Sequence, residues 1–236
     1  MLNDTPSMDQ LPAWAVANSI SSASKILHKK NSKVTIIEPC ILSSNRISLT
    51  KDGSLVFSNY NLLQAVKVGF AMPEIISLFK TPIKSIGAIK TVTKIRKLYF
   101  QPKLTIHQVQ TLLQGGLAST ICYANNDSYS KTIIMNESGC IDFSVNGHLL
   151  ARVIKNAYGN WELASSARDL PPSVSVKFRN LETVFRAAIG KIDPLVDPAE
   201  NNINVQGKIP LLEKFGYISR LSMRNIPIPR ELPNEI

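Results

Sequence analysis

The sequence predicts an α+β fold in which helices pack on one face of a mainly antiparallel sheet. Residues 172–221 alternate between two strand-like and two helix-like patterns, and residues 140–164 contain short strand-like runs separated by turn signals. An apolar content of 44% in 236 residues is enough for a packed core. We expect an N-terminal extension over 1–104, a domain over 105–225 and a proline-rich, extended tail over 226–236.

The first strand and helix of the domain's C-terminal half follow from the spacing of apolar residues. Val174, Val176 and Phe178 alternate with polar residues, which places three apolar side chains on one face of a strand. Asn180 suits the N-cap of the next helix, whose single apolar stripe ends at Gly190. The stripe consists of Leu181, Val184, Phe185, Ala188 and Ile189.

A second strand and helix follow. Ile203 and Val205 alternate with polar neighbours up to Gly207, and Pro210 suits the first turn of a final helix. That helix is expected to bury Leu211, Leu212, Phe215 and Ile218. Between the two halves, Asp193–Pro194 predicts a turn and residues 197–202 predict a polar loop.

The first half of the domain is expected to form one short helix and then a meander of strands. Thr105 can cap the helix, and Gly115 and Gly116 are expected to end it. Asn146–Gly147 is a strong signal for a tight hairpin turn. The expected strands cover residues 117–124, 131–136, 140–145, 148–155 and 160–164.

The N-terminal extension is expected to combine helices with a β-hairpin. Residues 46–57 alternate as two short strands around Asp52–Gly53, which suits their turn. A further strand is expected at 34–37. The expected helices cover residues 11–28, 61–71 and 74–80.

Two features of the extension leave alternatives open. Residues 83–99 have an apolar residue at every third position, a repeat that drifts round an α-helix. The segment is therefore either a helix buried on different sides or a helix that breaks near Gly87. In addition, residues 55–69 show the same order of strand, Asn-Leu pair, helix and glycine as residues 174–190. The extension is therefore either an addition to the domain or a degenerate second copy of it.

The charge is strongly basic and unevenly distributed. The net charge is +10, and residues 75–126 contain no Asp or Glu but include seven basic residues between Lys80 and Lys103. Such a surface attracts phosphates of lipid head groups or nucleic acids. Interleaved apolar residues favour an anionic membrane surface or an acidic partner, whereas nucleic acid ranks lower because no nucleic-acid-binding motif is present. A solvated basic face is the alternative.

The compartment and the cofactor content follow from what the sequence lacks. No run approaches the roughly 20 apolar residues of a membrane span, and the N-terminus has no secretory signal. Cys40, Cys122 and Cys140 are widely spaced, which argues against a zinc site and a disulfide framework. These observations predict a cytoplasmic protein. The common nucleotide-binding and metalloprotease motifs are also missing, so we expect neither a metal nor a cofactor.

A few residues are candidates for acid–base chemistry. His148 follows the Asn146–Gly147 turn, and the hairpin could bring Asp142 opposite Arg152 as an ion pair on the solvent face. An enzyme built on this domain would draw its acid–base groups from His148, Asp142, Glu162 and Tyr158.

The order of elements after residue 172 resembles the C-terminal half of sterol carrier protein-2 (SCP2)-like domains. The matching residues are Gly190, Lys191, Pro194, Ile203, Val205 and Gly207. The resemblance extends weakly back to residue 105, and it implies that helices and sheet enclose a hydrophobic cavity. One departure is the polar loop 197–202, where the family has a short helix with an aromatic pair.

The resemblance implies non-covalent binding, and carriage or presentation, of a lipid-like or polycyclic ligand. The expected ligand-binding residues are Trp161, Val176, Phe178, Val184, Phe185, Ile189, Leu211, Leu212, Phe215, Tyr217 and Ile218. Their spacing would also suit a solid core. The alternative function is a cyclase or isomerase that folds a polyketide- or isoprenoid-like substrate in such a cavity. A nucleic-acid-binding or structural role is a weaker third hypothesis.

Overall fold

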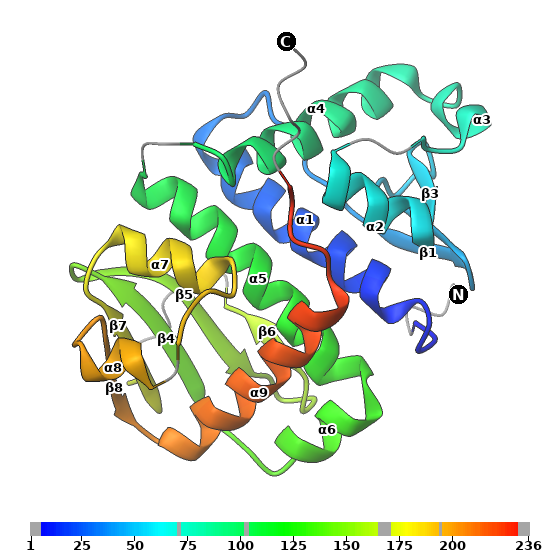
Figure 1. Ribbon diagram of the computed structural model, residues 1–236. Helices are drawn as coiled ribbons and strands as arrows, with labels where there is room; N and C mark the ends of the chain where they lie inside the picture. The colour runs from blue at the N-terminus through cyan, green and yellow to red at the C-terminus, as the bar shows by residue number, and fades with distance from the viewer. Residues whose placement is uncertain (1–5, 70–71, 102–103, 165–170, 194, 231–236) are drawn as a thin grey trace. The chain divides into compact units, whose positions relative to one another are not determined.

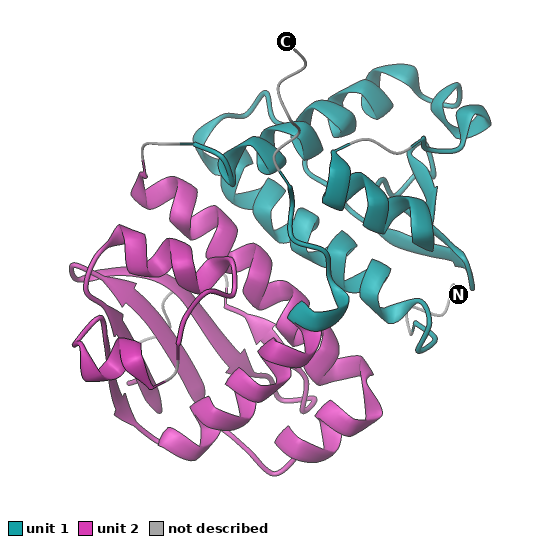
Figure 2. Ribbon diagram, viewed as in Figure 1, with its two compact units in different colours: residues 1–102, 223–236 teal, residues 103–222 magenta. Residues whose placement is uncertain are grey.

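The computed structural model describes residues 6–69, 72–101, 104–164, 171–193 and 195–230. The chain divides into two compact units, which Figure 2 distinguishes by colour. Unit 1 comprises residues 1–102 and 223–236, and unit 2 comprises residues 103–222. The fold is α+β with mainly antiparallel strand pairs, as predicted. No helix in the described part of the chain is long and apolar enough to cross a membrane.

In its described residues, unit 1 combines a small antiparallel sheet, in the order β1-β2-β3, with helices α1 to α4 (Figure 1). The strands are β1 (Cys40–Ser43), β2 (Arg46–Ser48) and β3 (Val56–Ser58). The helices are α1 (Leu11–Lys30), α2 (Asn59–Val68), α3 (Ile75–Leu78) and α4 (Pro82–Leu98). The predicted hairpin is confirmed, since Ile47 pairs with Phe57 across β2 and β3.

The strand predicted at residues 34–37 is wrong, because this segment makes its hydrogen bonds with side chains of α1. Ile37 N donates to Ser24 Oγ (2.9 Å), and Ile37 O accepts from Ser21 Oγ (2.7 Å). Backbone groups that are satisfied by a helix need no neighbouring strand. Strand β1 is not predicted from the sequence, and it pairs with β2 in the structure.

Helix α4 is continuous through Gly87, which decides between the two alternatives for residues 83–99. The three-residue repeat drifts round it as the helical period requires. Ile83 and Ile86 near its start are exposed, whereas Ile95 and Leu98 near its end are buried. The echo between residues 55–69 and 174–190 is only partial. Helix α2 has its N-cap at Ser58 rather than at Asn61, which corresponds to the N-cap Asn180.

Unit 2 contains a five-stranded sheet in the order β6-β5-β4-β7-β8. Its strands are β4 (Cys140–Val145), β5 (His148–Lys155), β6 (Trp161–Leu163), β7 (Val174–Phe178) and β8 (Ile203–Gly207). β4 and β7 are parallel, and the other three pairs are antiparallel. The helices are α5 (Ile106–Asn126), α6 (Ser128–Ile134), α7 (Leu181–Ala188), α8 (Val196–Ala199) and α9 (Ile209–Asn225). Figure 1 shows α5, α7 and α9 over one face of this sheet.

Two predicted strands of unit 2 are wrong. Residues 117–124 continue α5 through Gly115 and Gly116 instead of following a helix end. A Cβ at Gly116 would meet the carbonyl oxygen of Ala188 at 3.5 Å, so this glycine lies at the approach of α7 rather than at a cap. Residues 131–136 belong largely to α6, which Asp127 caps by accepting from Ser130 N at 2.7 Å. The meander therefore has three strands, β4 to β6.

The polar loop predicted at residues 197–202 is wrong in its first part, where α8 forms. Asp197 is fully buried there and accepts from Arg186 Nη1 at 2.8 Å and Nη2 at 3.0 Å. Asp197 also accepts from Asp193 N (2.8 Å) and from Asn202 Nδ2 (3.2 Å). Because this one carboxylate binds donors from both sides of α8 and from α7, the segment folds back on α7. Pro194 of the predicted turn lies outside the described residues.

Candidate functional site

One face of the unit 2 sheet is apolar. Successive residues of a strand point to opposite faces, so alternate positions of β4 and their partners on β7 share one face. Six buried residues occupy it: Ile141, Phe143, Val145, Val174, Val176 and Phe178. The rings of Phe143 and Phe178 stack with their centroids 6.4 Å apart. Strands β4 and β7 thus form one buried apolar surface within unit 2.

Helices α7 and α9 bring their own buried apolar residues. Leu211, Phe215 and Ile218 of α9 recur at i, i+4 and i+7, which keeps them on one side of the helix, and all three are buried. Val184 of α7 is also fully buried. The rings of Phe215 and Trp161 lie 6.2 Å apart, so α9 contacts the edge strand β6.

Hydrogen bonds hold both the backbone N–H and the backbone C=O of Trp161. Its backbone N donates to Asn125 Oδ1 (2.9 Å), and its carbonyl accepts from Asn125 Nδ2 (2.7 Å), so one side chain of α5 holds the backbone of β6. Lys155 Nζ lies 6.0 Å from the centre of the indole ring, within the range of a cation–π contact. Only 2% of Trp161 is exposed.

The indole Nε1–H of Trp161 is buried without an acceptor among the described residues. A buried N–H of tryptophan usually finds a partner, and leaving one unmatched costs about 1–3 kcal/mol. Trp161 therefore combines a buried apolar ring with one buried donor that has no acceptor among the described residues. The sequence predicts that Trp161 is buried, but it contains no signal for the direction of the N–H.

The eleven predicted ligand-binding residues do not all share one environment. The buried ones are Trp161, Val176, Phe178, Val184, Leu211, Phe215 and Ile218. Phe185, Ile189 and Leu212 are partly exposed. Tyr217 is exposed, and its ring meets that of Tyr129 edge-on at 6.2 Å. Tyr217 therefore lies at the surface of α9, away from the buried group.

The predicted ion pair of Asp142 and Arg152 is confirmed, but its predicted place on the solvent face is wrong. The two residues pair across β4 and β5, and the contact is bidentate: Nε to Oδ1 at 2.6 Å and Nη2 to Oδ2 at 2.7 Å. Both residues are buried. Asp142 alternates with Ile141 and Phe143, so the pair lies on the sheet face opposite the apolar one.

The four acid–base candidates are not brought together. His148 begins β5 and is exposed, whereas Tyr158 lies beyond the other end of β5 and is also exposed. Asp142 is occupied by Arg152, and Glu162 accepts from Asn156 Nδ2 at 3.0 Å. Since opposite ends of an eight-residue strand are about 23 Å apart, His148 and Tyr158 cannot act on one bond.

Two ion pairs attach the start of α9 to the loop before β4. Glu137 accepts from Lys208 Nζ and Lys214 Nζ, each at 2.6 Å, and its side chain is buried. Hydrogen bonds from Lys208 and Lys214 lower the pKa of Glu137 below its ordinary value of 4.5. The ionised carboxylate thus fixes α9 over the apolar face.

This arrangement predicts an acid-dependent stability. A carboxylate whose pKa is lowered by folding contributes stability fully above its ordinary pKa of 4.5, and loses it as the pH falls through the lower, folded pKa. The Glu137→Gln variant should therefore be less stable than the wild type at pH 7, and the difference should shrink below pH 4.5. Urea unfolding from pH 7 to about pH 3 measures it. A difference independent of pH would contradict the ionic role.

Comparisons with known proteins give similarity to solved structures but no match at the level of sequence. No family model matches the sequence, and no curated protein matches it. The solution structure of the sterol carrier protein domain 2 of Helicoverpa armigera is 20% identical to this chain, with a TM-score of 0.37. The similarity covers 52% of this chain and 92% of that one.

Proposed function

We propose that unit 2 binds one mostly apolar molecule, lipid-like or polycyclic, between the apolar face of its sheet and helices α7 and α9, and carries or presents it. The buried apolar residues of β4, β7 and α9 support this proposal. Burial of apolar area would supply most of the affinity, at about 25 cal/mol per Å² removed from water. The finer assignment of ligand-contacting residues, including Trp161, Phe178 and Phe215, belongs to the same proposal.

The observation that carries the proposal is the unmatched Nε1–H of Trp161. A ligand with one acceptor oxygen, such as a hydroxyl, carbonyl or carboxylate, would satisfy this donor and recover a hydrogen bond in a dry environment. The rest of the ligand would be apolar, because the neighbouring side chains are. The proposed ligand is thus an amphiphile with a small polar end, held polar end toward β6.

Native mass spectrometry of the purified protein tests whether a hydrophobic molecule is bound. Extraction into organic solvent then shows whether that molecule leaves unchanged, as carriage requires. Trp14 and Trp161 are the two tryptophans, so the Trp14→Phe variant leaves Trp161 as the reporter of unit 2. A change in its emission on adding pyrenedodecanoic acid is expected. An unchanged spectrum, together with no bound molecule, would contradict the proposal.

Trp161→Phe provides a sharper prediction. Phenylalanine keeps an aromatic ring but removes the N–H, so pyrenedodecanoic acid should bind about five- to tenfold more weakly, as expected for one lost hydrogen bond of about 1–1.5 kcal/mol. Dodecylpyrene, which lacks the carboxylate, should bind both proteins equally apart from the change in ring size. The pyrene emission of the probes gives both affinities. An equal loss for the two probes would show that Nε1 makes no contact with the ligand.

The enzyme alternative has less support. Its four acid–base candidates, His148, Asp142, Glu162 and Tyr158, lie at separate places in unit 2, and Asp142 is held by Arg152. Turnover of a polyene substrate that is lost in His148→Ala would favour this alternative over carriage.

A further inference from the structure

Unit 1 exposes a cluster of large apolar side chains where α3 meets α4. We call it the corner patch, and it consists of Met72, Ile75, Ile76, Phe79, Ile83, Ile86 and Ile89. Ile76, Phe79 and Ile83 are 84%, 77% and 86% exposed, and they occur within eight residues of chain. Single exposed apolar residues are ordinary, but a contiguous group of this kind marks a surface that binds something.

The helical period explains why part of the patch faces outward. The buried side of α4 consists of Ser85, Ala88, Thr91, Ile95 and Leu98. Ile83 and Ile86 point away from this side because the helix advances about 100° per residue, whereas Ile89 lies at its border and is 41% exposed. The small polar Ser85 takes the buried position of that segment, while the isoleucines are left in water. At the start of α4, therefore, isoleucines occupy outward positions that polar residues take on an ordinary surface helix.

Lysines accompany the patch on the same side of α4. Lys90, Lys94 and Lys97 are exposed and continue the outward face of the helix beyond Ile86. Within the described chain, none of these three lysines has an ion-pair partner. The nearby acids are already paired, Glu74 with Arg46 and Asp52 with Lys84. The outward face therefore carries uncompensated positive charge beside exposed isoleucines.

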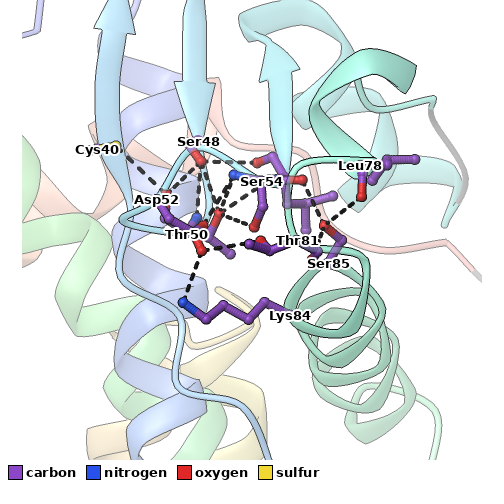
Figure 3. Close-up of polar contacts among 10 residues, drawn as sticks. Cys40, Ser48, Thr50, Asp52, Ser54, Leu78, Thr81, Lys84 and Ser85 are labelled. Atoms are coloured by element: carbon purple, nitrogen blue, oxygen red, sulfur yellow. Dashed lines mark hydrogen bonds and ion pairs between the residues drawn. The ribbon is translucent and has the colours of Figure 1, made fainter.

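The first turn of α4 is fixed to the loop between β2 and β3, as Figure 3 shows. Ser85 Oγ donates to the carbonyl of Ser54 at 2.8 Å. Thr81 Oγ1 and Lys84 Nζ both donate to Asp52 Oδ2, at 3.2 and 3.0 Å. The corner patch is thus presented from a hydrogen-bonded support, which favours a docking surface over an apolar segment without a fixed conformation.

We propose that the corner patch docks unit 1 onto the surface of an anionic lipid bilayer. Its isoleucines and Phe79 would enter the boundary between head groups and acyl chains, while Lys90, Lys94 and Lys97 contact head-group phosphates. This combination favours lipid over nucleic acid, which offers phosphates but no apolar phase for aliphatic side chains. It favours lipid over an acidic protein because α3 and the start of α4 lie at the outer edge of unit 1 (Figure 1), where exposed side chains can insert into a fluid surface.

Flotation of the full chain with vesicles tests the proposal. Binding is expected with phosphatidylcholine vesicles that contain one quarter phosphatidylglycerol, and much less with phosphatidylcholine alone. Ile76→Glu combined with Ile83→Glu should weaken binding at least tenfold, because both side chains would have to enter the apolar boundary. The matched control is Met135→Glu combined with Leu195→Glu, which changes two exposed apolar residues of unit 2 and should leave binding unchanged. All these side chains are exposed, so circular dichroism should show the same fold in each variant.

A second pair of variants tests the charge. Each lysine near an anionic surface contributes about fivefold in affinity, so Lys90, Lys94 and Lys97 changed together to Gln should weaken binding roughly a hundredfold at low salt. In the control variant, three exposed lysines of α1 are changed to Gln: Lys25, Lys29 and Lys30. This variant should lose much less affinity for the vesicles. If the two triple variants lost the same affinity for vesicles, the loss would come from net charge alone, and the proposal would be overturned. Binding of a DNA duplex with no binding of vesicles would overturn it in favour of nucleic acid.

Discussion

Replacing Asp142 with asparagine is expected to lower the free energy of unfolding by about 3–5 kcal/mol. The carboxylate makes a bidentate contact with Arg152, at 2.6 and 2.7 Å, and both residues are buried. Asparagine keeps the shape but not the charge, so the guanidinium keeps its positive charge in a place from which water is largely excluded. Losing one member of a buried pair costs more than the pair itself contributes.

Urea unfolding, followed through Trp161 emission in a Trp14→Phe background, measures this loss in unit 2. The control Asp193→Asn removes an exposed carboxylate of the same unit and should cost less than about 1 kcal/mol. Changing Asp142 to Leu and Arg152 to Met together should cost less than Asp142→Asn alone, because no charge is then left behind. If Asp142→Asn lowers the free energy of unfolding by less than about 1 kcal/mol, the ion pair is accessible to water and is not buried as the structure indicates.

The parts of the fold that the sequence predicts correctly are those whose hydrogen bonds and packing are local. The alternation of Val174, Val176 and Phe178, the Asn146–Gly147 turn and the Asn180 N-cap each specify their own few residues. The structure confirms all three. The Asp142–Arg152 pairing, by contrast, does not follow from the turn alone. A register shift between Phe143 and Ser144 leaves Leu150 unpaired and moves the partner of Asp142 from Ala151 to Arg152.

The errors occur where distant residues decide the conformation. Residues 117–124 alternate like a strand, but α5 is buried on many sides, so the one-sided stripe that identifies a helix is missing. Residues 34–37 have β-branched residues, yet Ser21 and Ser24 of α1 take their backbone hydrogen bonds. Similarly, Asp197 lies in a polar stretch, and its burial is explained by its contacts with Arg186, Asp193 and Asn202, which no local pattern predicts.

For the candidate site, the burial of several residues was predictable from the sequence, but the direction of their polar atoms was not. Spacing alone indicates that Phe215 and Ile218 face inward and that Trp161 lies on a strand, and both are so placed. It does not indicate that Tyr217 turns outward to Tyr129, or that the N–H of Trp161 is left without an acceptor among the described residues. The direction of a polar atom within a core depends on the packing of several elements, and no local pattern encodes it.

The second large effect is expected for Gly207→Ala, which should destabilise unit 2 by about 3 kcal/mol or more, or prevent it from folding. Gly207 ends β8 with φ +106°, a conformation that residues with a Cβ rarely adopt. A Cβ there would overlap the carbonyl oxygen of Ser173 and lie 3.2 Å from Val174 Cα. These are backbone atoms of the neighbouring strand and its approach, so the clash is relieved only by moving β8 away from β7.

Two other glycines separate the contributions of strain and overlap. Gly147 has φ +78°, but a Cβ added there would have no atom within 4 Å, so Gly147→Ala should show the left-handed backbone cost alone, about 1 kcal/mol. Gly216 lies within α9 with open space around it, and Gly216→Ala should raise stability by up to about 1 kcal/mol. Urea unfolding followed by Trp161 emission gives the midpoint of each variant. The midpoint should be highest for Gly216→Ala, intermediate for Gly147→Ala and lowest for Gly207→Ala. If Gly207→Ala destabilises the protein no more than Gly147→Ala does, β8 does not pack against β7 as closely as the pairing of Gly207 with Val174 requires.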